Sequence, residues 1–360
     1  MSKDKERIEF SAIIGNPPYQ VTKGGTKNVN VWQHFVKVAN LCGAKWVSMI
    51  HPGRWVVPKE QMKSVRDEIL DSGLNKFMLY PESNEIFDSV EIPGGITITN
   101  FKKDYKGKVD YFVRGEKQAK NYNKETKIMN NFEEEAFTKI FNDTNNYQNS
   151  MSSRVKGSVG SLNSSEFGYS REDQMKFIKD SSTGMKNPIK VWSNNGFGKG
   201  GGNKYDWYYI EKDKLNTIPS EIIASRKVMF SKVGKTTEGR KGGINGNIML
   251  ADKKAVGTNV FFVIPEKDDN YDLKLIQSMF CTKTVRFLMS ITQKDQCVRG
   301  FENIPDYTYF MDDMKDPKYN NKMFEGKLGL LTDEYFYKKF NFSQELIDHI
   351  ENKLGPKELA

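Results

Sequence analysis

The chain has 360 residues, which is enough for two domains or one large one. Hydrophobic residues make up 37% of it, so a packed core is expected and wholesale disorder is excluded. The formal net charge of +9 favours a polyanionic partner without selecting one. Three scattered cysteines lack disulfide or zinc-ligand spacing, so we expect reduced thiols and no metal site. The charged first ten residues lack a signal-peptide core, and no run of 18 apolar residues occurs, which predicts a cytoplasmic protein that does not enter a membrane.

Residues 8–113 alternate short apolar runs with amphipathic stretches. The pattern predicts strands at 8–14, 45–50, 77–80, 96–101 and 109–113, and helices at 29–41 and 61–70. Such alternation is typical of an α/β fold, here a mostly parallel, partial Rossmann-like sheet with covering helices. We expect residues 109–113 to pair with 96–101 after a turn at Lys106-Gly107. A ligand site is expected at the carboxyl ends of the strands.

After residue 115 the composition and the predicted secondary structure of the chain change. We assign 1–115 to the α/β domain, 116–150 to a polar connector with a helix at 132–141, 151–328 to a mixed α+β domain, and 329–360 to a helical tail. Within the third segment, residues 273–289 predict one helix. In the tail, Ser343 is the expected N-cap of a helix that ends at Lys353.

The most informative motif is Asn16-Pro17-Pro18-Tyr19, directly after the first predicted strand. An amino nitrogen conjugated to a ring is a poor nucleophile, because its lone pair is delocalised. Two hydrogen-bond acceptors, the Asn16 side-chain oxygen and the Pro17 carbonyl, can draw that nitrogen toward tetrahedral geometry. The two prolines fix φ and so aim the carbonyl, while Tyr19 offers a flat face for a flipped base. The alternative is a simple turn, since Asn, Pro and Tyr all suit turns.

Three stretches carry a family resemblance: IIGNPPYQ at 13–20, VSMIHPGRWV at 47–56 and NEIFDSVEIPGGITITNF at 84–101. They resemble the catalytic half of adenine-specific (N6) DNA methyltransferases from restriction–modification systems, from the catalytic motif through to a target-recognition region. The resemblance implies that Phe87, just before a strand, stacks on the face of the adenine opposite Tyr19. Phe87 can equally be a core residue. For His51 we expect a structural role.

The resemblance also implies S-adenosylmethionine as cofactor, bound through a glycine-rich turn after a strand. Residues 1–15 leave no room for such a turn. The run from Gly196 to Gly202 leads into a strand-like segment and is typical of a loop rather than a cofactor turn. The cofactor site is therefore expected to be incomplete in this chain. Three explanations fit: a subunit of a split enzyme, which the initial Met favours; a fragment of a longer enzyme; or a relic that keeps only DNA binding.

Basic residues concentrate between residues 226 and 254, interleaved with glycines and hydroxyls. This composition suits DNA phosphate contact, although a solvated basic loop would look similar. The candidate DNA-binding residues are Arg226, Lys227, Lys232, Lys235, Arg240 and Lys241.

From the sequence we expect site-specific N6 methylation of adenine in double-stranded DNA, in a restriction–modification or phage-defence setting. The chain would supply the catalytic loop and DNA recognition, and a second subunit would carry the glycine-rich cofactor motif. The competing interpretation is a non-catalytic DNA-binding or specificity subunit whose motif is idle.

Overall fold

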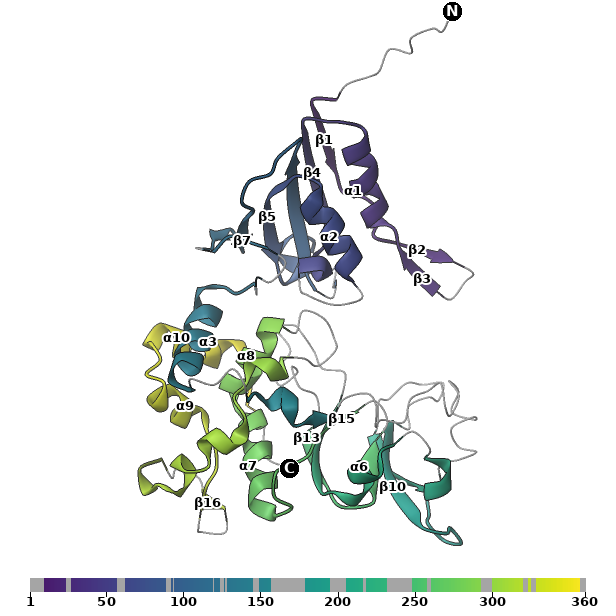
Figure 1. Ribbon diagram of the computed structural model, residues 1–360, viewed down its shortest axis with the longest axis vertical. Helices are drawn as coiled ribbons and strands as arrows, with labels where there is room; N and C mark the ends of the chain where they lie inside the picture. The colour runs from purple at the N-terminus through teal and green to yellow at the C-terminus, as the bar shows by residue number, and fades with distance from the viewer. Residues whose placement is uncertain are drawn as a thin grey trace, which may run out of the picture. The chain divides into compact units, whose positions relative to one another are not determined.

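The computed structural model describes residues 10–23, 27–56, 62–88, 92, 94–118, 120–123, 126, 128–144, 149–156, 179–194, 205–215, 218–231, 248–257, 260–292, 300–319, 323–324 and 328–356. It divides into two compact units, Met1–Glu134 (unit 1) and Glu135–Ala360 (unit 2) (Figure 1). The boundary falls inside one helix, α3 (Asn131–Thr144). No helix among these residues is long and apolar enough to cross a lipid bilayer.

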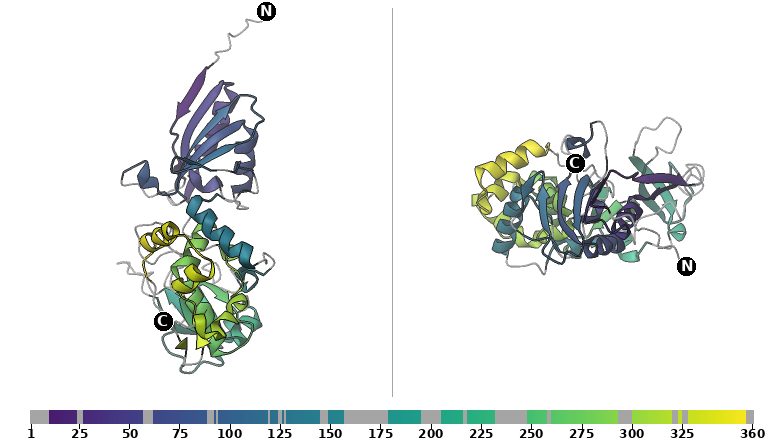
Figure 2. Two further views of the ribbon diagram at one scale, coloured as in Figure 1. Left: turned by 90° about the vertical axis from the view of Figure 1, so that its left-hand side faces the viewer. Right: turned by 90° about the horizontal axis from the view of Figure 1, so that it is seen from above.

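Unit 1 is built on a six-stranded sheet (Figures 1 and 2). From edge to edge, its strands are β1 (Ala12–Gly15), β4 (Trp46–Pro52), β6 (Ile96–Lys102), β5 (Leu74–Tyr80), β7 (Asp110–Val113) and β8 (Glu116–Lys117). The first pair, β1 and β4, is parallel, with Gly15 opposite Met49. The Asn-Pro-Pro-Tyr motif therefore leaves the sheet at the carboxyl end of an edge strand.

Most of the sheet runs in one direction, as predicted. Strand β6 is antiparallel to both of its neighbours, β4 and β5, while β5 and β7 are parallel. The expected pairing of residues 109–113 with 96–101 is wrong, because both edges of β6 are already occupied. Strand β7 pairs instead with the outer edge of β5, where Phe77 lies opposite Tyr111.

Two helices, α1 (Trp32–Leu41) and α2 (Lys63–Asp71), cover one face of this sheet (Figure 1). Strand β4 alternates, so that Val47, Met49 and His51 are buried while Ser48 and Ile50 are only half-buried. Val36 of α1 and Ile69 of α2 belong to the same hydrophobic cluster as Val47. Alternate residues of the strand and one face of each helix are therefore buried together, and the core lies between the sheet and its two helices.

A β-hairpin precedes α1 and was not predicted. It pairs β2 (Gln20–Lys23) with β3 (Lys27–Asn30), and Gln20 lies directly opposite Asn30. The predicted helix at 29–41 accordingly begins three residues late, at Trp32. The signal for the hairpin was the Gly24-Gly25 pair between two runs that contain valine, because paired glycines favour tight hairpin turns.

Unit 2 contains several small sheets. One is β11 (Tyr205–Glu211), β10 (Pro188–Asn194) and β14 (Ala255–Gly257); a second is β13 (Ile248–Ala251), β12 (Lys227–Ser231), β15 (Val260–Val263) and β9 (Val155–Lys156); a third pairs β16 (Met323–Phe324) with β17 (Leu328–Gly329). Its further α-helices are α6 (Ser220–Ala224), α7 (Asn270–Cys281), α8 (Lys283–Thr292), α9 (Asp333–Lys339) and α10 (Gln344–Lys353). This mixture confirms the predicted fold class.

The single helix predicted at 273–289 is two helices. Thr282 adopts an extended backbone between α7 and α8, and the side chain of Asp333 accepts hydrogen bonds from the N–H groups of Lys283 (2.9 Å) and Thr284 (2.8 Å). A carboxylate from a distant helix therefore caps α8, which no local pattern reveals. In the tail, Ser343 caps α10 through Leu346 N–H, as predicted.

Candidate active site in unit 1

The Asn16–Tyr19 loop follows β1 directly and is anchored at its far end. The carbonyl of Tyr19 accepts a hydrogen bond from the N–H of Val31 (3.1 Å), just before α1 begins. Pro17 is buried, while Asn16 and Pro18 are exposed. The loop is thus fixed by a buried proline and a backbone bond, and it presents the Asn16 amide to solvent.

The side chains of Asn16 and Tyr19 contact each other. The Tyr19 hydroxyl donates a hydrogen bond to Asn16 Oδ1 at 3.0 Å. Burial raises the pKa of Tyr19, so the hydroxyl keeps its proton. The oxygen expected to receive a substrate amino group is therefore occupied by the motif's own tyrosine in this structure.

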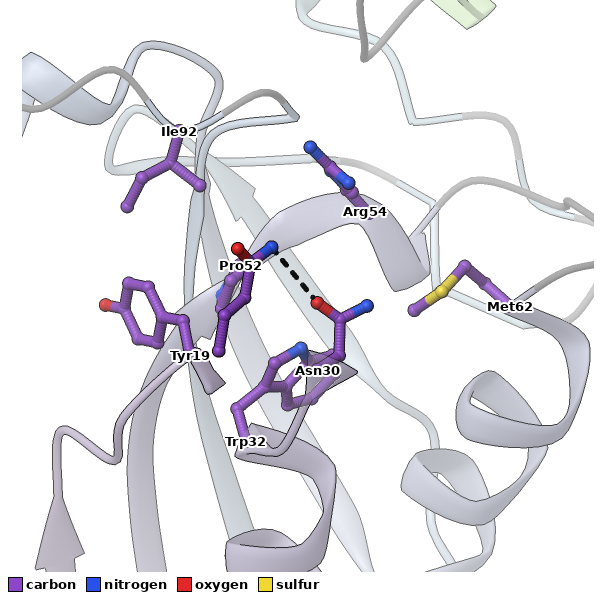
Figure 3. Close-up of a pocket in the computed structure, with 8 residues that line it drawn as sticks. Tyr19, Asn30, Trp32, Pro52, Arg54, Met62 and Ile92 are labelled. Atoms are coloured by element: carbon purple, nitrogen blue, oxygen red, sulfur yellow. Dashed lines mark hydrogen bonds between the residues drawn. The ribbon is translucent and has the colours of Figure 1, made fainter. Parts of the chain in front are cut away.

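A pocket opens beside Tyr19 (Figure 3). Its lining residues come from the loop, the hairpin and four other segments: Tyr19, Gln20, Asn30, Trp32, Pro52, Arg54, Met62 and Ile92. The cavity volume is about 190 Å³. An engineered apolar cavity of about 150 Å³ holds benzene, so a planar heterocycle can enter this one.

The floor of the pocket is a rigid aromatic stack. The Trp32 ring lies parallel to the ring of His51, with centroids 4.3 Å apart. His51 is fully buried, and its Nε2 lies 2.9 Å from Thr99 Oγ1 on β6. Burial lowers the pKa of His51 to about 3, so the ring is neutral. These contacts agree with the structural role expected for His51.

Phe87 lies after a short 3-10 helix (Ser83–Glu85) and is half-buried. It does not line the pocket; Ile92 does, and its N–H donates to Ser83 Oγ at 2.8 Å. The stacking role of Phe87 stays a prediction. The nearby Gly95 is required, because its φ is +68° and a Cβ there would come within 2.1 Å of the Tyr80 carbonyl oxygen.

Two of the six candidate DNA-binding residues lie among the described residues. Arg226 pairs with Asp252 (3.5 Å) and also donates to Asn270. Lys227 corrects our prediction: it is 0% exposed and its Nζ donates to the carbonyls of Ile222 (2.5 Å) and Ala255 (2.7 Å). Burial lowers the pKa of Lys227 to about 8, and this lysine cannot reach a phosphate. Lys232, Lys235, Arg240 and Lys241 lie outside the described residues.

The pocket residues that the sequence did not indicate include three polar ones, Gln20, Asn30 and Arg54. The first two are brought together only by the hairpin. Arg54 follows Gly53, where a Cβ would lie 2.5 Å from the Gly94 carbonyl oxygen. This packing is a property of the folded structure, so the sequence carries no signal for the position of Arg54.

The described residues do not fit an S-adenosylmethionine site of the expected type. No described helix that follows a strand is preceded by a pair of glycines, and the Gly94-Gly95 pair leads into strand β6. Glycine-rich cofactor turns open helices, because their N–H groups must point at the ligand. The Gly196–Gly202 run lies outside the described residues.

Large hydrophobic side chains are exposed on and just before β1, at the start of β4 and on α1. We call six of them the edge patch: Phe10, Ile14, Phe35, Val38, Leu41 and Trp46. Ile14 on β1 is 84% exposed and Leu41 on α1 is 70% exposed. Within the described residues, β1 pairs with β4 alone, so its other edge offers free backbone N–H and C=O groups.

Comparison with known proteins begins with the N-terminal segment. The family model described as Eco57I restriction-modification methylase matches residues 1–87. A protein of Mycoplasma pneumoniae, described as an uncharacterized adenine-specific methylase, is 28% identical over 145 residues, which cover 37% of this chain. The match spans only 34% of that relative's length.

Two solved structures are similar at low identity. The type IIL restriction-modification enzyme MmeI, in complex with DNA, matches with a TM-score of 0.44 and 10% identity over 96% of this chain and 55% of its own. The type IIG restriction endonuclease BpuSI matches with a TM-score of 0.36 and 10% identity, over 96% of this chain and 54% of its own. The chain thus spans about half the length of these enzymes. Residues 1–87, which contain the Asn-Pro-Pro-Tyr loop, are therefore the part of the chain that is similar to Eco57I restriction-modification methylases.

Proposed function

We propose that this chain supplies the catalytic loop for N6 methylation of adenine in double-stranded DNA, within a restriction–modification or phage-defence system. One observation carries the proposal: Asn16-Pro17-Pro18-Tyr19 leaves a parallel edge strand beside a pocket of suitable size, with Asn16 and Tyr19 in contact. The family match over residues 1–87 supports it.

The loop acts on the amino group of a flipped base. Asn16 Oδ1 and the Pro17 carbonyl accept its two N–H groups, which localises the nitrogen lone pair. The Tyr19 hydroxyl releases Asn16 Oδ1 when the base enters, and the phenol ring then covers one face of the base. We propose that Phe87 covers the opposite face after a movement of its segment, since it does not line the pocket.

We further propose that the methyl donor, S-adenosylmethionine, is bound by another polypeptide segment that docks on the edge patch. Two features support this: the expected cofactor turn has no counterpart among the described residues, and β1 has an open edge. A strand added in parallel beside β1 would satisfy its free backbone groups. Burying an aliphatic side chain such as Ile14 or Leu41 contributes roughly 1.5–3 kcal/mol.

DNA contact outside the pocket is assigned to the basic residues that remain candidates after the correction at Lys227: Arg226, Lys232, Lys235, Arg240 and Lys241. The second candidate function is a non-catalytic DNA-binding subunit. It is favoured by the occupied Asn16 acceptor and by the lack of the expected cofactor turn among the described residues.

Methyl transfer to DNA by the chain together with its cofactor-binding segment tests the function. Asn16→Ala should lower the rate by about 10²–10³-fold, which is the usual effect of removing one pre-organised hydrogen-bond group, and leave DNA affinity nearly unchanged. The exposed Asn84→Ala is the matched control. Equal rates for Asn16→Ala and the wild type would identify the motif as idle and leave the DNA-binding subunit as the function.

Calorimetric titration of S-adenosylmethionine into the isolated chain tests the cofactor proposal. We expect no binding in a folded sample. Micromolar binding would contradict the proposal of an external cofactor segment, and would mean that residues outside the described part complete the site.

A further inference from the structure

The pocket beside Tyr19 has a polar rim that the methylation chemistry does not use (Figure 3). Its members are Gln20 on β2, Asn30 on β3 and Arg54 on the 3-10 helix Gly53–Val56. They come from different elements, yet all line the same cavity as Tyr19 and Trp32. A cavity with aromatic walls and a few convergent polar groups is typical of a small-ligand site.

The two rim amides form a fixed pair. Gln20 and Asn30 are directly opposite in the hairpin register, and Gln20 Nε2 donates to Asn30 Oδ1 at 3.2 Å. This bond orients both groups, so Asn30 Nδ2 keeps two donors and Gln20 Oε1 keeps its acceptor sites. An oriented amide with a donor and an acceptor is the group that proteins use to read adenine edges.

Arg54 adds a cation at the same rim. Its backbone position is set by a tight contact, in which Gly53 N–H donates to the Gly95 carbonyl at 2.9 Å. Arg54 is half-buried as a residue, and its guanidinium has a planar shape that matches a phosphate group. The pocket therefore combines a ring platform, an amide pair and a phosphate-binding group.

We propose that this pocket recognises a whole nucleotide: Arg54 binds the phosphate, and an N–H of Asn30 donates to the ring nitrogen next to the amino group of the base. In adenine the unprotonated N1 lies beside the 6-amino group, whereas guanine has N1–H beside the 6-carbonyl, so a base that enters through this edge is selected for adenine over guanine. The proposal rests on the proposed function, because it assumes that the base enters beside Tyr19.

Nucleotide binding to the isolated chain tests this, measured by NMR titration with adenosine 5′-monophosphate, adenosine and guanosine 5′-monophosphate. We expect the monophosphate of adenosine to bind about tenfold more tightly than adenosine, the gain from one or two charged hydrogen bonds. Arg54→Gln should abolish that difference and leave adenosine binding in place, and Arg54→Lys should restore part of it. Lys76→Gln, at an exposed position on β5, is the matched control.

The amide pair is tested in the same assay. Asn30→Ala should weaken binding of both adenine ligands and narrow the preference over guanosine 5′-monophosphate, while Asn84→Ala should change neither. Equal binding of adenosine and its monophosphate, no response to Arg54→Gln, or no binding of any of the three ligands would overturn the proposal. The methyl-transfer assay is independent of these titrations. If the wild-type chain binds the three ligands in the expected order of affinity but shows no methyl transfer, the proposed function alone is rejected.

Discussion

Unit 1 and unit 2 differ in where they leave large hydrophobic side chains. Among the residues whose burial is described, every exposed large hydrophobic lies between Phe10 and Trp46 in unit 1. In unit 2, phenylalanines such as Phe230, Phe280 and Phe301 are buried against one another. Single exposed hydrophobic residues are normal, and a group of them marks an interaction site where they form one patch. Among the described residues, unit 2 thus buries its large hydrophobic side chains, whereas unit 1 leaves several of them uncovered on β1, β4 and α1.

The largest expected effect is a loss of stability on removing a buried aromatic side chain from the core of unit 2. Phe280 is 0% exposed and packs edge-on against Phe230, with centroids 4.6 Å apart. Phe280→Ala should destabilise unit 2 by about 3–5 kcal/mol, because the cavity left in a closed core does not collapse fully. Chemical denaturation measures this. A loss below about 1 kcal/mol would mean that the unit 2 core is loosely packed.

The buried His51 is expected to make the stability of unit 1 depend on pH. Unfolded His51 takes up a proton near pH 6.5, while the buried ring does so only near pH 3, so stability is complete above pH 6.5 and falls as the pH drops toward 3. The slope is about 1.4 kcal/mol per pH unit. In His51→Phe the slope should be smaller, because the ring stacks on Trp32 but does not titrate. Urea unfolding between pH 4 and 8, followed by Trp fluorescence, tests this.

The matched control is His34→Gln on the exposed side of α1. The substitution at His51 is tolerable because the hydroxyls of Thr97 and Thr99 keep acceptors in the carbonyls of His51 (3.1 Å) and Met49 (3.3 Å). An unchanged slope in His51→Phe would assign the acid sensitivity of unit 1 to other groups.

Two substitutions at Tyr19 distinguish the role of its ring from the role of its hydroxyl. Tyr19→Ala should weaken adenosine binding by roughly 1–3 kcal/mol, the value of a stacked base. Tyr19→Phe keeps the ring and frees Asn16 Oδ1 from its 3.0 Å hydrogen bond, so its affinity should equal or exceed that of the wild type. The same NMR titration measures both. Weaker binding by Tyr19→Phe than by the wild type would mean that the hydroxyl contacts the ligand.

The smallest expected effect is the change in stability when an exposed residue of the edge patch is replaced. Val38 is 57% exposed and Val36, on the same helix, is 2% exposed. Val38→Ser should change the stability of the isolated chain by less than about 0.5 kcal/mol, and Val36→Ser should cost about 1–3 kcal/mol. Thermal melts compare the two. Similar losses would break the contrast between the units, because they would show that the α1 outer face is already covered.

Several features were predictable from local patterns. Strands β4 and β6, helix α2 and the Ser343-capped α10 lie within a few residues of their predicted bounds, because alternation and capping are properties of short segments. The break between α7 and α8 was not predictable, since its cap, Asp333, is some fifty residues away. The same holds for β7, whose partner is decided by which strand edge is free.

The sequence by itself determined the α/β class and the position of Asn16-Pro17-Pro18-Tyr19 at the end of a strand, because both depend on neighbouring residues. Only the tertiary structure decided which residues share a site. It buried Lys227 beneath two carbonyls and brought Gln20, Asn30 and Arg54 to one pocket. Among the described residues, it also left β1 paired on one side only. Burial and cross-strand pairing depend on how distant segments pack, and a side chain's chemistry cannot be assigned until that packing is known.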